Sequence, residues 1–163
     1  MFERESKLCA FAIEYCRKLM RDIPDEKLAI QPASGMNHPA WVMGHLAVVA
    51  DMALKMLGQP AKCPREWRAL FGMGAQPSTD RALYPSCEVL LKAVESGYCA
   101  IIVAVQQAPA ELVDAPHSAP FFKEELPQVG DLLGHIMTTH FTMHLGQVSA
   151  WRRTQGMPGV LGL

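Results

Sequence analysis

Three of the chain's histidines lie close together in the segment HIMTTHFTMHLGQ, which runs from His135 to Gln147. In a helix that turns about 100° per residue, His140 and His144 stack on one face with Cβ atoms about 6 Å apart. Both imidazoles can then reach one metal ion. His135 precedes His144 by nine residues, so it points about 180° away. We expect His135 to lie on the opposite surface, solvated or at a dimer interface, where Asp131 can pair with it.

The surroundings of the histidine pair leave two interpretations open. Apolar residues fall within about 40° of His144 around the helix, so this face is predicted to be buried. Buried ring nitrogens need partners. A metal ion supplies them, and so do hydrogen bonds within an ordinary core, since an HxxxH pair alone is a common accidental match. The apolar residues of this face are Leu133, Met137, Val148 and Trp151.

A third ligand must come from another part of the chain, because metal sites that leave a position open for chemistry usually use three side chains. His45 is the candidate, since Val42 and Val49 place it on an apolar helical face. His38 lies seven residues earlier, about 10 Å along the axis, and is interpreted as a helix-entry or pocket-rim residue. His117 lies in the proline-rich segment DAPHSAPFF and is expected to be exposed.

The residue types restrict the chemistry of such a site. In HExxH metalloproteases a glutamate follows the first histidine as the general base, whereas Phe141 holds that position here. Peptide hydrolysis by that mechanism is therefore disfavoured. Three neutral ligands keep the full charge of a divalent ion, which suits the ionisation of a bound thiol or water. We expect the metal to be zinc, nickel or iron. The sequence does not decide whether the catalytic group is a metal-bound water or a metal-bound thiol.

Helices must position these residues, because apolar spacing of three and four recurs along the chain and no pair of strand-like segments is present. The long connection after the second helix contains a predicted short helix near 64–71, in which Trp67 and Phe71 form a small satellite core. A connection of this length suggests that it covers something. The predicted class is all-α, a four-helix bundle. The long helices are predicted at 3–22, 38–57, 87–107 with Ser86 as N-cap, and 127–155.

Composition sets the broad class of protein. The chain has 163 residues, of which 50% are hydrophobic and 19% charged, and its net charge is −1. This size predicts one domain over residues 1–163. A net charge of −1 gives no sign of a basic surface that would bind nucleic acid or an anionic membrane. No signal peptide or membrane span is apparent, so we expect a cytoplasmic protein, and its five dispersed cysteines are expected to be reduced thiols. The high apolar content favours a homodimer.

Two motifs in order carry a family resemblance. The segment NHPAWVMGHLA, followed much later by HFTMHLGQVSAWRR, resembles the DinB-like (DinB/YfiT) superfamily, and REWRALFG and LYPS extend the resemblance over nearly the whole chain. The resemblance implies a bundle with up-down-down-up threading, often dimeric, that holds a divalent metal through His45, His140 and His144. Characterised relatives include thiol-cofactor S-transferases and mycothiol-dependent maleylpyruvate isomerases, in which the metal activates a low-molecular-weight thiol.

Three functional hypotheses follow, and the sequence leaves open whether the chain is an enzyme. The first is a metal-dependent thiol S-transferase or isomerase acting on a small apolar molecule between the second and last helices. The alternative is a non-catalytic, stress-related protein that binds a metal or small ligand, with the loop residue Cys63, expected to be exposed, as a conceivable fourth ligand. The third is a dimeric interaction module whose histidines satisfy one another. The pocket candidates are His38, Trp41, Met137, Gln147 and Trp151.

Overall fold

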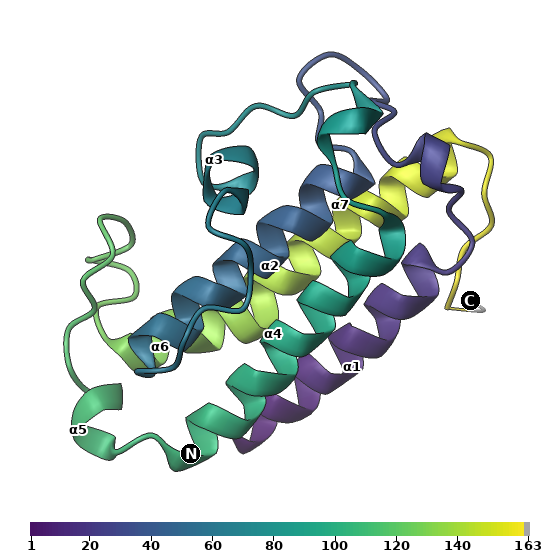
Figure 1. The fold of residues 1–163 in the computed structure, drawn as a ribbon. Helices are drawn as coiled ribbons and strands as arrows, with labels where there is room; N and C mark the ends of the chain where they lie inside the picture. The colour runs from purple at the N-terminus through teal and green to yellow at the C-terminus, as the bar shows by residue number, and fades with distance from the viewer. Residues whose placement is uncertain (162–163) are drawn as a thin grey trace.

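The computed structural model describes residues 1–161, and its regular structure is helical throughout. Within these residues no strand is formed, and a single isolated bridge pairs Pro116 with Gln128. The all-α class is therefore confirmed. The long helical segments lie side by side (Figure 1) and are α1 (Glu3–Met20), α2 (Pro39–Met56), α4 (Cys87–Gln107) and the run of α6 (Val129–His135), η3 (Ile136–His140) and α7 (Phe141–Thr154). The short elements are η1 (Asp25–Lys27), α3 (Trp67–Phe71), η2 (Arg81–Leu83) and α5 (Ala110–Val113).

Side-chain caps define where the long helices begin. His38 caps α2 by accepting a hydrogen bond from the backbone N–H of Trp41 at 3.2 Å, and Pro39 occupies the first turn. Ser86 caps α4 as the sequence predicted. Gly58 follows α2 with φ of +70°, a left-handed conformation that ends a helix without steric cost. α1 ends at Met20, slightly before the predicted Asp22.

The helices enclose one hydrophobic core cluster. α2 packs against α4 and α7, and α1 packs against the same two helices. α2 and α4 approach closely at Gly97, where a Cβ would lie 2.8 Å from the Cβ of Ala50. Tyr98 of α4 stacks on Phe141 of α7 with ring centroids 4.0 Å apart. This packing brings α2 against the helix that carries the histidine pair.

The last long helix is interrupted, which the sequence did not predict. It begins at Val129, where Gln128 and Asp131 form a capping box, and residues Ile136–His140 form a π-helical turn before α7. A π turn bonds residue i to i+5 and so advances less around the axis per residue than an α-helix does. A count of about 100° per residue therefore gives a wrong angle around the axis between a residue before this turn and a residue after it.

Two long connections pack against the long helices. The connection between α2 and α4 carries α3, which lies over α2, and the connection from α4 to α6 carries α5 (Figure 1). Trp67 and Phe71 of α3 are buried and belong to the main core cluster, so they form no separate satellite core. The expectation that His117 is exposed is wrong, because the second connection buries it to 6% exposure.

A buried arginine ties the end of α7 to the end of α1. The side chain of Arg152 is 2% exposed, and its guanidinium forms an ion pair with Asp22. The guanidinium also donates to the carbonyls of Leu19 at 2.8 Å and Pro158 at 3.2 Å. Hydrogen bonding from Arg152 holds the pKa of Asp22 below its ordinary value.

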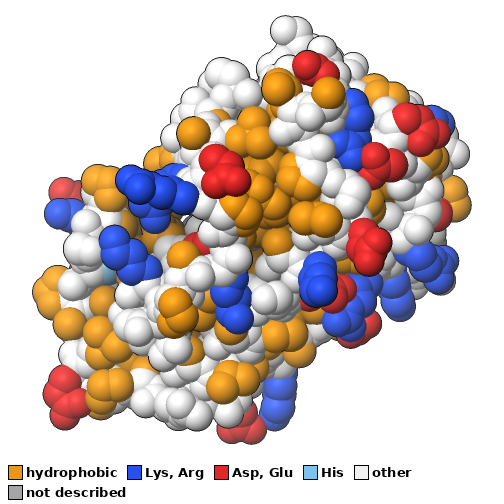
Figure 2. All heavy atoms as spheres, in the orientation of Figure 1, with side chains coloured by type: hydrophobic (Ala, Val, Ile, Leu, Met, Phe, Trp, Pro, Cys, Tyr) orange, Lys and Arg blue, Asp and Glu red, His pale blue; other side chains and the backbone are white. Residues whose placement is uncertain are grey.

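The outer surface carries both signs of charge. On the face shown in Figure 2, Lys and Arg side chains and Asp and Glu side chains are scattered, and hydrophobic side chains gather near the middle of the face. Among the described residues, the helices are all too short or too polar to span a bilayer. The cytoplasmic location stays a prediction.

Candidate metal centre

The three histidines selected from the sequence converge between α2 and the C-terminal helical run. His45 comes from α2, His140 ends the π turn, and His144 lies in the first part of α7. One ring nitrogen of each lies within 4.8 Å of the others. The ring centroids are 4.6 Å apart for His140 and His144, 4.8 Å for His45 and His144, and 5.4 Å for His45 and His140. We call these three residues the histidine trio.

The closest nitrogens of the trio have the spacing of two ligands on one ion. The Nε2 atoms of His45 and His140 are 3.3 Å apart. Two nitrogens that bind a tetrahedral metal at about 2.0–2.1 Å lie about 3.4 Å from each other. The ligand nitrogen of His144 lies within 4.8 Å of both. The donor set therefore fits a divalent metal.

Hydrogen bonds on the far side of two rings leave their Nε2 lone pairs free. Nδ1–H of His45 donates to the carbonyl of Phe71 at 2.8 Å, and Nδ1–H of His144 donates to Oε1 of Gln147 at 3.1 Å. A carbonyl oxygen can only accept, so the tautomers follow from these partners. Asn37 donates to the same oxygen of Gln147 at 3.1 Å, which holds the amide in place. Such outer partners orient metal-binding imidazoles in proteins.

The third ring is left with an unpaired nitrogen. Nδ1 of His140 is buried and has no hydrogen-bond partner among the described residues. When Nε2–H of His140 donates to His45, this Nδ1 is a bare buried acceptor, which costs free energy. The Nε2 lone pairs that face one another thus outnumber the protons they can share, and a cation can satisfy them together. Nδ1 of His140 has no partner among the described residues in either case.

Burial keeps the trio neutral. Desolvation, reinforced by the neighbouring rings, lowers the pKa of His140 to about 3 and that of His144 to about 4. Desolvation also lowers the pKa of His45. All three imidazoles are therefore unprotonated near neutral pH, the form that binds metals. Within the described part of the chain, no carboxylate or thiol joins the cluster, so a bound divalent ion keeps its full charge.

Two neighbours of His45 determine where its ring lies. A Cβ at Gly44 would lie 2.3 Å from ring carbons of Phe71, so only glycine lets α3 approach α2 closely enough for the Phe71 carbonyl to reach His45. Trp41 stacks on the His45 ring at 4.8 Å with the planes 8° apart. The role of the Phe71 carbonyl has no signal in the sequence, because every residue carries one.

An apolar cavity of about 310 Å³ lies directly beside the trio. Its walls come from α2, from the end of α6 with η3, and from both long connections, so these connections do cover something. Within the described residues, its lining includes one charged side chain, Arg68, and no acidic one. The lining residues are His45, Val48, Val49, Met52, Arg68, Gly72, Met73, Pro120, Phe121, Phe122, Leu132, His135, Ile136 and His140.

None of the five pocket candidates from the sequence lines this cavity. His38 is fully buried at the start of α2, with Nε2 2.8 Å from the carbonyl of Ser78. Trp41 and Gln147 contact the rings of His45 and His144 from outside the cavity. Met137 is fully buried in the core, and Trp151 donates from Nε1 to the carbonyl of Ile30 at 2.7 Å.

His135 is the clearest correction to the sequence analysis. It does not face away from the trio: it is half-buried, lines the cavity, and its ring centroid lies 5.8 Å from that of His140. The π turn accounts for the error, because it changes the angle between His135 and His144. Asp131 does not pair with His135 and instead accepts from the backbone N–H of Gln128 at 3.1 Å.

Cys63 does not supply a fourth ligand. It is half-buried, not exposed as expected, and it borders a separate cavity with Asp51, Arg65 and Arg68. Burial, with the nearby Asp51 carboxylate, raises the pKa of its thiol to about 12, so the thiolate that binds metals is suppressed. Among the described residues, the trio is the one group of His, Cys, Asp or Glu side chains that could hold a metal ion.

An all-helical fold with a buried histidine trio beside an apolar cavity defines a class of candidate metal-binding helical proteins. The chain belongs to the DinB superfamily, whose family model matches residues 10–148, a range that contains the whole trio. This confirms the resemblance carried by the GHL and HFTMHLGQ motifs. No curated protein and no solved structure matches the chain.

Proposed function

We propose that this protein holds a divalent metal ion, zinc, nickel or iron, on Nε2 of His45, His140 and His144, and that it acts on a small molecule in the adjoining cavity. The observation that carries the proposal is that His45 and His140 belong both to the trio and to the cavity wall. A molecule bound in the cavity can therefore reach the proposed metal directly. Three protein ligands leave a fourth coordination position, which such a molecule can occupy.

The proposed reaction class is thiol transfer or a thiol-dependent isomerisation. A bound metal supplies Lewis acidity, which lowers the pKa of a thiol or water. Among the described residues, the cavity has no carboxylate to act as a general base. A thiol, with a pKa of about 8.5, needs far less help to ionise than water, with a pKa of about 15.7. A low-molecular-weight thiol is therefore the favoured cofactor, and hydrolysis is less favoured.

The chain's own residues contribute orientation and exclusion of water. Phe71 and Gln147 hold two imidazoles with Nε2 directed at the site. The apolar walls from Val48, Val49 and Ile136 keep an electrophile and a thiol away from bulk water, which strengthens electrostatic interactions inside.

The proposal includes one domain of up-down-down-up threading and a homodimer. In Figure 1, α2 and α4 run in one direction while α1 and α7 run in the other, which supports this threading.

Leu8 and Phe11 of α1 are exposed to 57% and 62%, and Val103 of the adjacent α4 to 59%. Exposed apolar side chains on neighbouring helices support an interface between copies.

The first test is elemental analysis of protein purified without an affinity tag. We expect close to one metal ion per chain in the wild type, loss of it in His45→Ala, and retention in His135→Ala, the matched control from the same cavity wall. Equal loss from both variants would contradict the ligand assignment. Absence of metal after reconstitution with zinc, nickel and iron(II) would exclude the metal site.

The second test separates the enzyme from its alternative. Metal-loaded protein is incubated with low-molecular-weight thiols and an aromatic chloride electrophile, and thioether formation with chloride release is followed. Turnover that disappears in His45→Ala supports the transferase. Stable metal without thiol binding or turnover supports instead a non-catalytic, stress-related metal- or ligand-binding protein.

A further inference from the structure

The cavity beside the trio has one cation at its edge. Arg68 of α3 is exposed and is the one charged side chain in the lining, as far as the described residues go. The ion pairs of the described residues do not include it. Arg68 therefore keeps its hydrogen-bond donors available for a bound anion.

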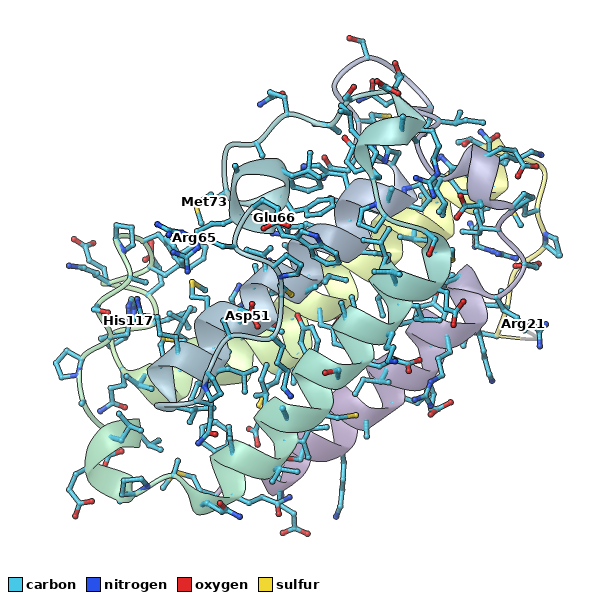
Figure 3. All side chains as sticks on the ribbon, in the orientation of Figure 1. Arg21, Asp51, Arg65, Glu66, Met73 and His117 are labelled. Carbon is cyan, nitrogen blue, oxygen red and sulfur yellow. The ribbon has the colours of Figure 1, made fainter. Side chains whose placement is uncertain are left out.

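The backbone of α3 fixes the position of Arg68. Trp67 and Phe71 on either side of it are buried, which anchors the short helix to the core. The carbonyl of Arg68 accepts from the N–H of Gly72 at 3.0 Å, where a Cβ on Gly72 would lie 2.4 Å from that oxygen. Figure 3 shows Arg65, Glu66 and Met73 around the same short helix. The short helix that carries Arg68 is thus anchored, while the Arg68 side chain itself is exposed and lines the cavity.

Aromatic rings from the connection between α4 and α6 line the same cavity. Phe121 and Phe122 meet edge to face at 5.5 Å, and Phe122 meets His135 in the same way at 5.5 Å. Phe122 has φ of +57°, which non-glycine residues rarely adopt. Its carbonyl accepts from the N–H of Leu126 at 2.9 Å, which helps to hold this conformation. The loop therefore presents rings to the cavity, and rings pack best against a flat apolar body.

The size of the cavity limits the ligand. Its volume of about 310 Å³ lies at the small end of the range of about 300–1,000 Å³ found for small-molecule pockets. One guanidinium binds a carboxylate through two parallel hydrogen bonds and balances its single charge. A phosphate carries a charge of about −1.5 to −2 at neutral pH, which one guanidinium leaves partly unbalanced. The charge of the rim therefore matches a monoanion.

We infer that the cavity takes a small aromatic or similarly flat apolar carboxylate, with its carboxylate on Arg68 and its other end at the histidine trio. The inference rests on the proposed function, because it names the substrate class of the same site. Val48, Val49 and Ile136 contact the apolar body, and the half-buried His135 faces it from the trio's side of the cavity. Arg68 acts as a specificity-determining residue and not as a catalytic one.

The probes are 3-phenylpropanoate and its neutral isostere 3-phenylpropanamide, with binding measured by NMR titration. Wild type, Arg68→Gln and the matched control Arg65→Gln are compared, each chelator-treated and metal-loaded. Arg65 is the control because it is also an exposed arginine beside α3 but lies outside the lining of this cavity. We expect wild type to prefer the acid by about tenfold, since a charge-assisted hydrogen bond at a solvated rim contributes at the low end of its range.

Arg68→Gln should bind the acid and the amide equally, with the same affinity for the amide as wild type. Its helicity and metal content should be unchanged. Arg65→Gln should keep the preference for the acid. Equal binding of acid and amide by wild type, or binding of neither at millimolar concentration, would overturn the inference. So would a preference that appears only with metal and persists in Arg68→Gln, because the carboxylate would then bind the metal itself. A preference that depends on Arg68 in protein that takes up no metal would refute the proposed function alone.

Discussion

His45 and His140 place their Nε2 atoms 3.3 Å apart, although 95 positions separate the two residues in the chain. Both rings are removed from water, and burial lowers the pKa of each. Two neutral rings at this distance share at most one proton between the facing nitrogens. A cation between them satisfies both lone pairs at once, which is why the metal affinity of this trio is the property to test first.

Replacing either histidine of the pair on the last helix is expected to abolish stable metal binding. His140→Ala and His144→Ala each leave two of the three ligand nitrogens, so we expect the metal affinity to fall by more than about 100-fold. This is more than the loss typical of replacing a residue that only hydrogen-bonds a ligand. Competition against a chromophoric chelator measures this loss. His135→Ala is the control and should bind metal as wild type does. Tight binding by His144→Ala would show that the metal lies elsewhere.

Gly44→Ala should disturb the site without touching a ligand. The new Cβ would lie 2.3 Å from the Phe71 ring, and overpacking of this kind costs about 1–3 kcal/mol. Because α3 must shift, the Phe71 carbonyl loses its place at His45, and metal affinity should fall together with the free energy of unfolding. Both are measured, by chelator competition and by urea denaturation.

Gly146→Ala is the matched control for that experiment. Gly146 lies in α7 and a Cβ there meets no atom within 4 Å. Alanine is favoured over glycine inside helices by about 0.8–1.0 kcal/mol, so this variant should be as stable as wild type or more so. Destabilisation of both variants by the same amount would argue against the contact between Gly44 and Phe71 as the cause.

Gln147→Leu should weaken metal binding through the orientation of His144. The substitution removes the acceptor of the Nδ1–H bond while keeping a side chain of similar volume. Loss of such an outer partner typically costs about 10–100-fold in metal affinity. Asn37→Ala, which removes only the donor to Gln147, should have a smaller effect. Equal affinities for all three proteins would show that this hydrogen bond is not needed.

Asp22→Asn should lower stability in a way that depends on pH. The folded protein holds the pKa of Asp22 below 3.8 through its hydrogen bonds with Arg152, so the unfolded chain binds the proton more readily. The contribution is present above pH 3.8 and is lost as the pH falls through the folded-state pKa. Since the Asp22 side chain is 44% exposed, we expect about 1 kcal/mol at neutral pH.

Urea denaturation of wild type and Asp22→Asn at neutral pH and at about pH 3 checks this expectation. The difference between their free energies of unfolding should be smaller at about pH 3. Glu3→Gln is the control, because its partner Lys7 and Glu3 itself are 76% and 81% exposed, and exposed pairs contribute little. A difference for Asp22→Asn that stays constant over this pH range would contradict the assignment to the carboxylate charge.

Much of the helical framework could be predicted because helices follow local rules. Apolar spacing and the cap Ser86 depend on residues a few positions apart. The same local geometry placed His140 and His144 on one face. His45 was selected from an apolar helical face and from the resemblance, and the tertiary structure brings it to the pair.

Only the tertiary structure decided what surrounds the trio. The π turn brought His135 to the cavity, contrary to a count at 100° per residue, and the second connection buried His117 despite its proline-rich segment. The Phe71 carbonyl and the rim position of Arg68 depend on where α3 packs. The sequence by itself determined the long helices and the donor types, since those depend on neighbours in the chain. The cavity and the orientation of the rings depend on contacts between distant segments, and no local pattern encodes those contacts.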